Sequence, residues 1–156
     1  MSFKLSARSR ARLIGVHPDL VRVVERAITV TLVDFSVVEG VRTLAKQMEY
    51  FKKGKSMTMR SRHLTGHAVD LAPWMMVNGV MTIDWESDAG WEALADAMKS
   101  SAYALSVPVE WGGDWKTFKA VFAAATPAGS SEHYLVLPSH VGALMACLVR
   151  GGAWDF

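Results

Sequence analysis

An Asn-Gly pair at residues 78–79 lies between two apolar runs, and this feature constrains the fold more than any other part of the sequence. Both residue types tolerate the positive φ angles that a two-residue hairpin turn requires. The flanking runs, AVDLAPWMMV at 68–77 and VMTID at 80–84, are long enough to form strands. We therefore expect an antiparallel hairpin in the middle of the chain.

Helical spacing and capping residues predict three helices around this hairpin, and two β-branched or aromatic segments predict further strands. The order of these elements is mixed, which favours the α+β fold class. The apolar run at 141–149 is too short to cross a membrane and is interpreted as a buried helix or as a segment that does not pack well. The other predicted elements are helices from Pro18, from Thr43 to Lys53 before Gly54, and after Ser87, strands at 33–38 and 107–111, and a polar loop at 55–66.

The composition limits the possible classes of protein. A chain of 156 residues fits one domain with one core, so we expect a single domain over residues 1–156. The net charge is only +2 and no basic stripe stands out, so a nucleic-acid partner is not expected. The basic start lacks the apolar core of a signal peptide. The one cysteine, Cys147, excludes an internal disulfide and a CxxC zinc site, so any metal would need His and carboxylate ligands.

The segment SRHLTGHAVD at 61–70 places His63, His67 and Asp70 within eight residues. Imidazole and carboxylate groups suit zinc, and a catalytic zinc site typically has three protein ligands and a water. The two histidines have the spacing of a helix face, but Gly66 and the strand pattern after it argue against a helix. On a loop that enters a strand, His63 and Asp70 can converge while His67 points elsewhere. The spacing alone is compatible with two interpretations: a metal site, or two histidines that are structural or solvent-exposed.

The pattern SxHxxGxAxD in this segment resembles the signature of zinc peptidases that include D-alanyl-D-alanine dipeptidases and carboxypeptidases. A longer series of segments over about residues 3–119 resembles the phage L-alanyl-D-glutamate endopeptidases, which are endolysins. The resemblance implies a small antiparallel sheet flanked by helices, and zinc-dependent hydrolysis of an amide bond in the peptidoglycan stem peptide. The matching segments are GVHPDLVRVVERAI (15–28), VDFSVVEGVRTLAKQ (33–47), SRHLTGHAVDLAPW (61–74) and VEWGGDWKTF (109–118).

The resemblance also implies roles for individual residues. His63 and Asp70 match two zinc ligands. Arg42 matches an active-site arginine, whose guanidinium would hold a substrate carboxylate and stabilise the anionic intermediate. A structural ion pair between Arg42 and Glu39 is the alternative interpretation. Ser61, the first residue of the signature, is expected to contact the substrate.

Other polar and aromatic residues near the motif receive lesser roles. His67 lies at a variable position of the signature and is not expected to be a ligand. Gln47 matches a polar family position and is expected to be an exposed helix residue. The tryptophans Trp74, Trp111 and Trp115 either line a cleft or belong to the core, and the core is favoured because most large aromatic side chains are buried.

The family pattern breaks after WGGDWKTF. The family expects a general base and, three positions later, a third histidine ligand, but both positions are alanines here. His133 is the next candidate ligand, with Glu132 beside it as candidate base, if about ten residues are inserted; His140 is a weaker candidate ligand. Alternatively, residues 120–156 are a replaced tail, for example after a frameshift, because they contain only three charged residues. The third ligand would then be missing.

Three functions follow from these observations. The leading one is a zinc-dependent endopeptidase that cuts the L-alanyl-D-glutamate bond during host lysis. A D,D-carboxypeptidase of the same superfamily and an inactive wall-binding remnant are the alternatives. The expected partner is the peptidoglycan stem peptide, bound by a monomer without membrane insertion. With no signal peptide, the protein would be made in the host cytoplasm and reach the cell wall through a separate pore.

Overall fold

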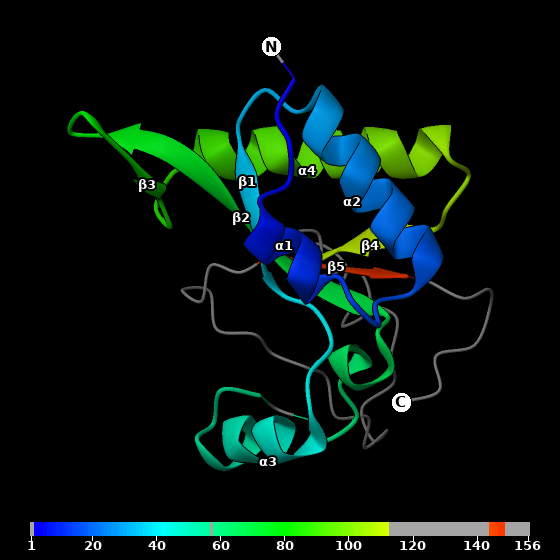
Figure 1. Ribbon diagram of the computed structural model, residues 1–156. Helices are drawn as coiled ribbons and strands as arrows, with labels where there is room; N and C mark the ends of the chain where they lie inside the picture. Colours follow the sequence, from blue (N-terminus) through cyan, green and yellow to red (C-terminus); the bar gives the residue numbers. More distant parts are fainter. Residues whose placement is uncertain (1, 57, 113–143, 149–156) are drawn as a thin grey trace, which may run out of the picture.

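The computed structural model describes residues 2–56, 58–112 and 144–148, which form helices around an antiparallel sheet (Figure 1). The predicted α+β fold class is therefore confirmed. No helix in the described part of the chain is long and apolar enough to cross a membrane. The elements are α1 (Ala7–Arg12), α2 (Pro18–Val30), β1 (Phe35–Glu39), α3 (Leu44–Lys52), the 3-10 helix η1 (Arg62–Thr65), β2 (Ala68–Val77), β3 (Val80–Ile83), α4 (Asp88–Ala104), β4 (Val109–Trp111) and β5 (Leu144–Leu148).

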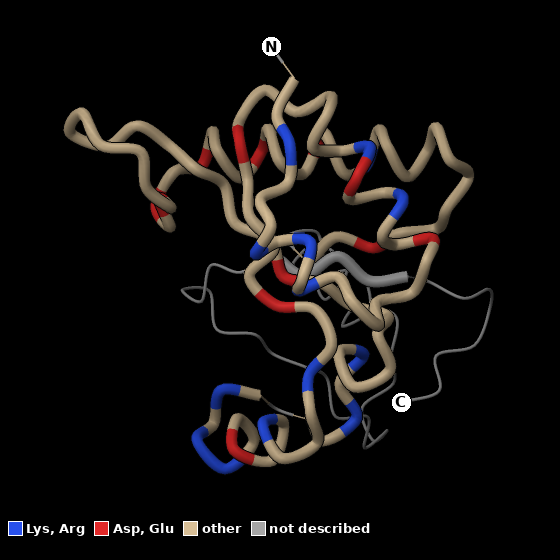
Figure 2. Tube along the Cα trace, viewed as in Figure 1, with Lys and Arg blue, Asp and Glu red and all other residues tan. Residues whose placement is uncertain are grey.

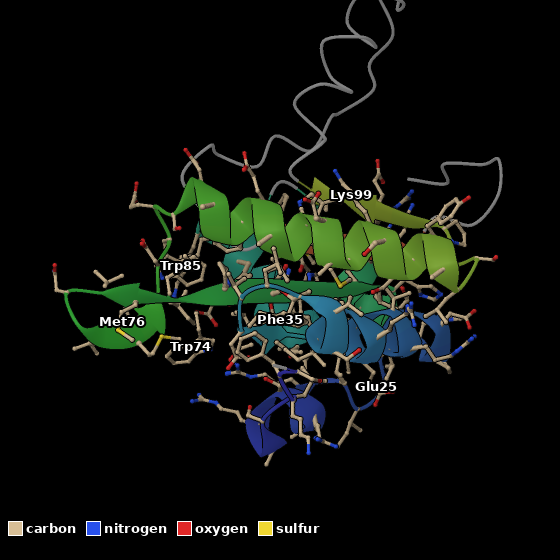
Figure 3. All side chains as sticks on the ribbon, turned by 90° about the horizontal axis from the view of Figure 1, so that it is seen from above. Glu25, Phe35, Trp74, Met76, Trp85 and Lys99 are labelled. Carbon is tan, nitrogen blue, oxygen red and sulfur yellow. The ribbon has the colours of Figure 1, made fainter. Side chains whose placement is uncertain are left out.

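Strand β2 is the centre of the sheet. Its first half pairs with β1 on one side, up to Pro73, and with β5 on the other. Its second half, from Trp74 to Val77, pairs with β3. Strand β4 pairs with β5 at the edge. The predicted hairpin is confirmed, since Asn78 and Gly79 have φ angles of 50° and 81°. Trp74 and Met76 lie on one side of this hairpin and Trp85 on the other (Figure 3).

Helices α2 and α4 build the apolar core with the sheet. Helix α4 packs on β2 and β4, α2 packs on α4, and α1 lies beside β1. Fully buried core residues come from α2 (Leu20), β2 (Leu71) and α4 (Met98). Both helix starts are confirmed: Pro18 opens α2, and the Ser87 side chain accepts a hydrogen bond from the Gly90 N–H at the start of α4.

Two local predictions were wrong. Residues 144–148 form strand β5 and not part of a buried helix. A short apolar run fits either element, and here its backbone pairs with both β2 and β4. The predicted loop at 55–66 contains helix η1, which the Ser61 side chain caps by accepting a hydrogen bond from the His63 N–H. Helix α1 was not predicted, although Ser6 caps it through the Ser9 N–H.

Two glycines allow the N-terminal segment to approach the rest of the chain closely. Gly66 ends η1 with a φ angle of 74°, and its carbonyl accepts a hydrogen bond from the His17 N–H at 2.8 Å. A Cβ at this position would lie 2.4 Å from the Gly15 carbonyl oxygen. At Gly40, a Cβ would lie 1.9 Å from the Arg12 carbonyl oxygen. Neither position has room for a side chain, because the atoms in the way belong to the backbone.

Gly66→Ala is expected to lower the free energy of unfolding by about 2 kcal/mol or more, because the left-handed backbone is strained for alanine and the new methyl collides with Gly15. Urea unfolding followed by circular dichroism measures this loss. Gly54→Ala is the matched control, since Gly54 also has a positive φ of 68° but no atom within 4 Å of the added Cβ. Equal losses in the two variants would contradict the close contact.

Candidate active site

His63 and Asp70 converge, as the loop-into-strand interpretation expected. His63 is buried on η1, and Asp70 lies in the first half of β2. The His63 Nε2 atom is 3.4 Å from Asp70 Oδ1. The His63 Nδ1 atom is 2.7 Å from the Gly40 carbonyl oxygen, which can only accept, so Nδ1 carries the proton in the neutral ring. The lone pair of Nε2 and the Asp70 carboxylate then face the same small space, which suits a shared cation.

Glu39 joins this pair through an irregularity in the pairing of β1 with β2. The register shifts between Val37 and Glu39, so that Glu39 lies opposite Asp70. Donor atoms of Glu39, His63 and Asp70 all lie within 4.8 Å of one another, which is the geometry of a possible metal site. The Glu39 carboxylate is already held by two cations, with Oε1 at 2.6 Å from Lys46 Nζ and Oε2 bonded to Arg42. Glu39 is therefore better suited to hold Arg42 than to ligate a metal.

The Arg42 guanidinium lies buried between these groups. Its Nε and Nη2 atoms donate to Glu39, and Nη1 donates to Gln47 Oε1 at 2.7 Å. The structural ion pair with Glu39, given above as the alternative for Arg42, is thus present. The Nη2 atom also lies 3.8 Å from Asp70 Oδ2, and the Tyr50 ring covers the guanidinium at 4.8 Å. The three bonds leave one N–H on each of Nη1 and Nη2 to offer to a carboxylate.

The prediction that Gln47 is exposed is wrong. Its side chain is completely buried and joins α3 and the loop after it to Arg42. Its Nε2 atom donates to Ser56 Oγ at 2.8 Å and to the Thr58 carbonyl at 2.5 Å. The sequence carried a signal for this arrangement, because Gln47 and Tyr50 are three residues apart and lie on one side of a helix. That spacing did not reveal which side of the helix faces inward.

The other candidates near the motif lie around this cluster. Ser61 caps η1, and its hydroxyl oxygen accepts from the His63 N–H at 3.3 Å. His67 contacts Thr65 through Nδ1 at 2.9 Å, and its ring centroid is 5.1 Å from that of His17. It is therefore engaged with neighbours other than Asp70. Trp111 is buried in the core, as favoured above.

The candidate third ligands and base, His133, His140 and Glu132, lie outside the described residues, as does Trp115. Their roles remain predictions. The nearest described part of the tail is β5, whose Met145 pairs with Asp70 through the backbone. Strand β5 therefore brings the C-terminal part of the chain next to the strand that carries Asp70.

Comparison with known proteins identifies the family of this chain. The model of the phage L-alanyl-D-glutamate peptidase family matches residues 1–122. The L-alanyl-D-glutamate peptidase of Escherichia phage T5 is 34% identical over 118 residues, which are 74% of this chain and 83% of the T5 protein. The enzyme of that name from Listeria phage A118 is 38% identical over 89 residues, 55% of this chain but only 28% of the A118 protein.

A solved structure extends the comparison to three dimensions. The crystal structure of Serratia marcescens L-Ala D-Glu endopeptidase ChiX matches with a TM-score of 0.69 and 38% identity, over 95% of this chain and 91% of that one. The fold is thus that of a class of peptidases that includes an L-Ala D-Glu endopeptidase. The chain belongs to the phage L-alanyl-D-glutamate peptidase family, which confirms the resemblance seen in the sequence.

Gln47→Leu is expected to lower the free energy of unfolding by about 2 kcal/mol, because it leaves the Arg42 Nη1 group buried without its acceptor. Urea unfolding measures the loss. Met48→Ala, at the neighbouring and exposed position, is the control and should change stability by less than about 0.5 kcal/mol. A Gln47→Leu variant as stable as the control would contradict the network.

The stability contributed by Glu39 is expected to depend on pH. Burial raises the pKa of Glu39, but the hydrogen bonds and charges of Arg42 and Lys46 outweigh burial and lower this pKa below its ordinary value. A pKa lowered by folding stabilises the native state at neutral pH, and this contribution is lost as the pH falls through the folded-state pKa. In urea unfolding with a chelator present, the stability gap between wild type and Glu39→Gln should shrink from pH 7 towards pH 3. A gap that does not change with pH would contradict this.

Proposed function

We propose that this chain hydrolyses the L-alanyl-D-glutamate bond of the peptidoglycan stem peptide, with His63 and Asp70 as two zinc ligands. One observation carries the proposal: His63 Nε2 and Asp70 Oδ1 lie 3.4 Å apart beside a buried arginine, in a chain of this peptidase family. The names of the matched proteins from phage T5 and Serratia marcescens support the choice of bond. They favour it over the D,D-carboxypeptidase alternative.

The donor set fits zinc. A histidine and a carboxylate side by side are a usual pair of zinc ligands. The histidine here donates its other ring N–H to a backbone carbonyl, as zinc-binding histidines commonly do. When bound, zinc lowers the pKa of a coordinated water and polarises a substrate carbonyl. We keep His133 as the proposed third ligand, with His140 as the second candidate.

A general base must take a proton from the attacking water and later give it to the leaving amine. Glu132 is the proposed base, because it is a carboxylate adjacent to the proposed third ligand in the sequence. Glu39 is less suited to this role, since Arg42 and Lys46 hold both of its oxygens.

Arg42 and Ser61 are the proposed substrate contacts. The two N–H groups that Arg42 keeps can hold a carboxylate of the stem peptide as a bidentate partner. Glu39 and Gln47 fix the guanidinium from the other side, so that little side-chain freedom is lost on binding. The Ser61 hydroxyl accepts from His63 and keeps its own proton to donate to a peptide carbonyl.

The proposed biological role is host lysis, because two of the matched proteins come from phages. The proposed partner is the peptidoglycan stem peptide, bound by a monomer with no nucleic acid. We propose synthesis in the host cytoplasm and passage to the wall through a separate pore.

Zinc content is the first test. We expect one zinc per chain by elemental analysis, lost in His63→Ala and in Asp70→Ala. His67→Ala is the matched control, since it removes a histidine of the same motif that contacts Thr65 instead, and it should keep the metal. Loss of zinc in His133→Ala would support His133 as third ligand, whereas retention would move that role to His140. No zinc in the wild type would contradict the proposed metal site.

Digestion of defined stem peptides with the same protein preparations tests the reaction. The expected product is a peptide with a new amino group on D-glutamate. A chelator should abolish its release, and added zinc should restore it. Release of terminal D-alanine instead would indicate the D,D-carboxypeptidase. Binding to intact sacculi without any new amine would indicate the inactive remnant.

A further inference from the structure

Helix α3 faces the molecule with its polar side. Gln47 is completely buried and Tyr50 covers Arg42, so this side holds the candidate active site together. Three apolar side chains follow at i, i+4 and i+7 along the adjacent side of the helix, next to Gln47. This apolar stripe, Leu44, Met48 and Phe51, has exposed fractions of 58%, 42% and 46%. An ordinary surface helix does the opposite and buries its apolar side.

The segment that carries this stripe is strongly basic. Residues 41–62, called the α3–η1 segment below, contain seven Lys or Arg and one Glu. The rest of the chain contains ten Lys or Arg and fourteen Asp or Glu, so it is acidic. The basic residues of the segment gather around α3 and η1 at one end of the molecule (Figure 2). Three of the cations are in ion pairs: Arg42, which is buried, and Lys46 with Glu39, and Lys53 with Glu49.

We propose that the α3–η1 segment docks this protein on the surface of an anionic phospholipid membrane. The apolar stripe would enter the boundary between headgroups and acyl chains, with the helix lying in the plane of the surface. The exposed basic side chains around it, among them Lys52 and Lys55, would bind the anionic headgroups, each contributing a small attraction near the surface. This inference does not depend on the proposed peptidase activity.

Charge and apolar surface together favour this partner over others. A nucleic acid or an acidic polysaccharide would match the charge but would leave the stripe in water. An apolar groove on another protein would cover the stripe but would leave the excess positive charge unmatched. An anionic bilayer satisfies both, because its charge is at the surface and its apolar phase lies directly below.

Co-sedimentation of the full chain with vesicles tests the proposal. Vesicles of phosphatidylethanolamine and phosphatidylglycerol in a 3:1 ratio are compared with pure phosphatidylcholine. We expect the partition coefficient to be at least tenfold larger for the anionic vesicles, and to fall in 0.5 M salt because the attraction is screened. The double variant Leu44→Ser/Phe51→Ser should lose at least tenfold of this binding, and Lys52→Glu/Lys55→Glu should lose it to a similar extent.

Leu32→Ser/Tyr103→Ser is the matched control. It removes two side chains that are 87% and 89% exposed but lie outside the α3–η1 segment, so binding should stay as in the wild type. Melting temperatures and zinc contents of all variants are measured in parallel, which separates loss of docking from loss of fold or metal. Equal binding to both vesicles, no binding to either, or full binding by Leu44→Ser/Phe51→Ser would overturn the proposal. So would a dimer in sedimentation velocity that this variant dissociates, because a second copy would then cover the stripe.

Discussion

The rest of the site depends on two hydrogen bonds between the chain after β1 and helix η1. The Gly40 carbonyl accepts from the His63 ring at 2.7 Å, and the Arg42 N–H donates to the His63 carbonyl at 3.0 Å. These bonds fix the positions of the candidate zinc ligand, His63, and the candidate substrate arginine, Arg42, relative to each other. Gly40 also packs directly against the Arg12 carbonyl, so the end of helix α1 supports this part of the chain after β1. A site built in this way needs little rearrangement to bind a metal or a substrate.

Electrostatics explain why the cluster contains more groups than the proposed reaction uses. A buried guanidinium is costly unless its charge and its N–H groups are satisfied. Glu39 supplies the charge and Gln47 supplies an acceptor, and Lys46 balances the second oxygen of Glu39. Arg42 is thereby fixed with its Nη2 atom 3.8 Å from Asp70 Oδ2. The same residues that make burial tolerable also orient the proposed substrate contact.

Helix α3 is unusual because this network occupies its inner side. In α2, the buried side is apolar and includes Leu20, Val23 and Val24. In α3, the buried side must supply Gln47 to Arg42, so its apolar residues remain on the outside. The network thus accounts for the exposed stripe as a structural consequence. The network uses Arg42 and Lys46 of the surrounding segment, and it does not account for the rest of the segment's basic charge.

The sequence by itself determined those features that rest on local signals. The Asn78–Gly79 hairpin, the start of α2 at Pro18, the cap of α4 at Ser87 and the convergence of His63 and Asp70 each follow from a few neighbouring residues. Tertiary structure alone decided the burial of Gln47, the strand conformation of 144–148 and the position of Glu39 opposite Asp70. The physical reason is that each of these depends on partners far away in the sequence. A glutamine is buried only where a distant arginine needs its oxygen, and a short apolar run becomes a strand only where a sheet leaves backbone groups to pair.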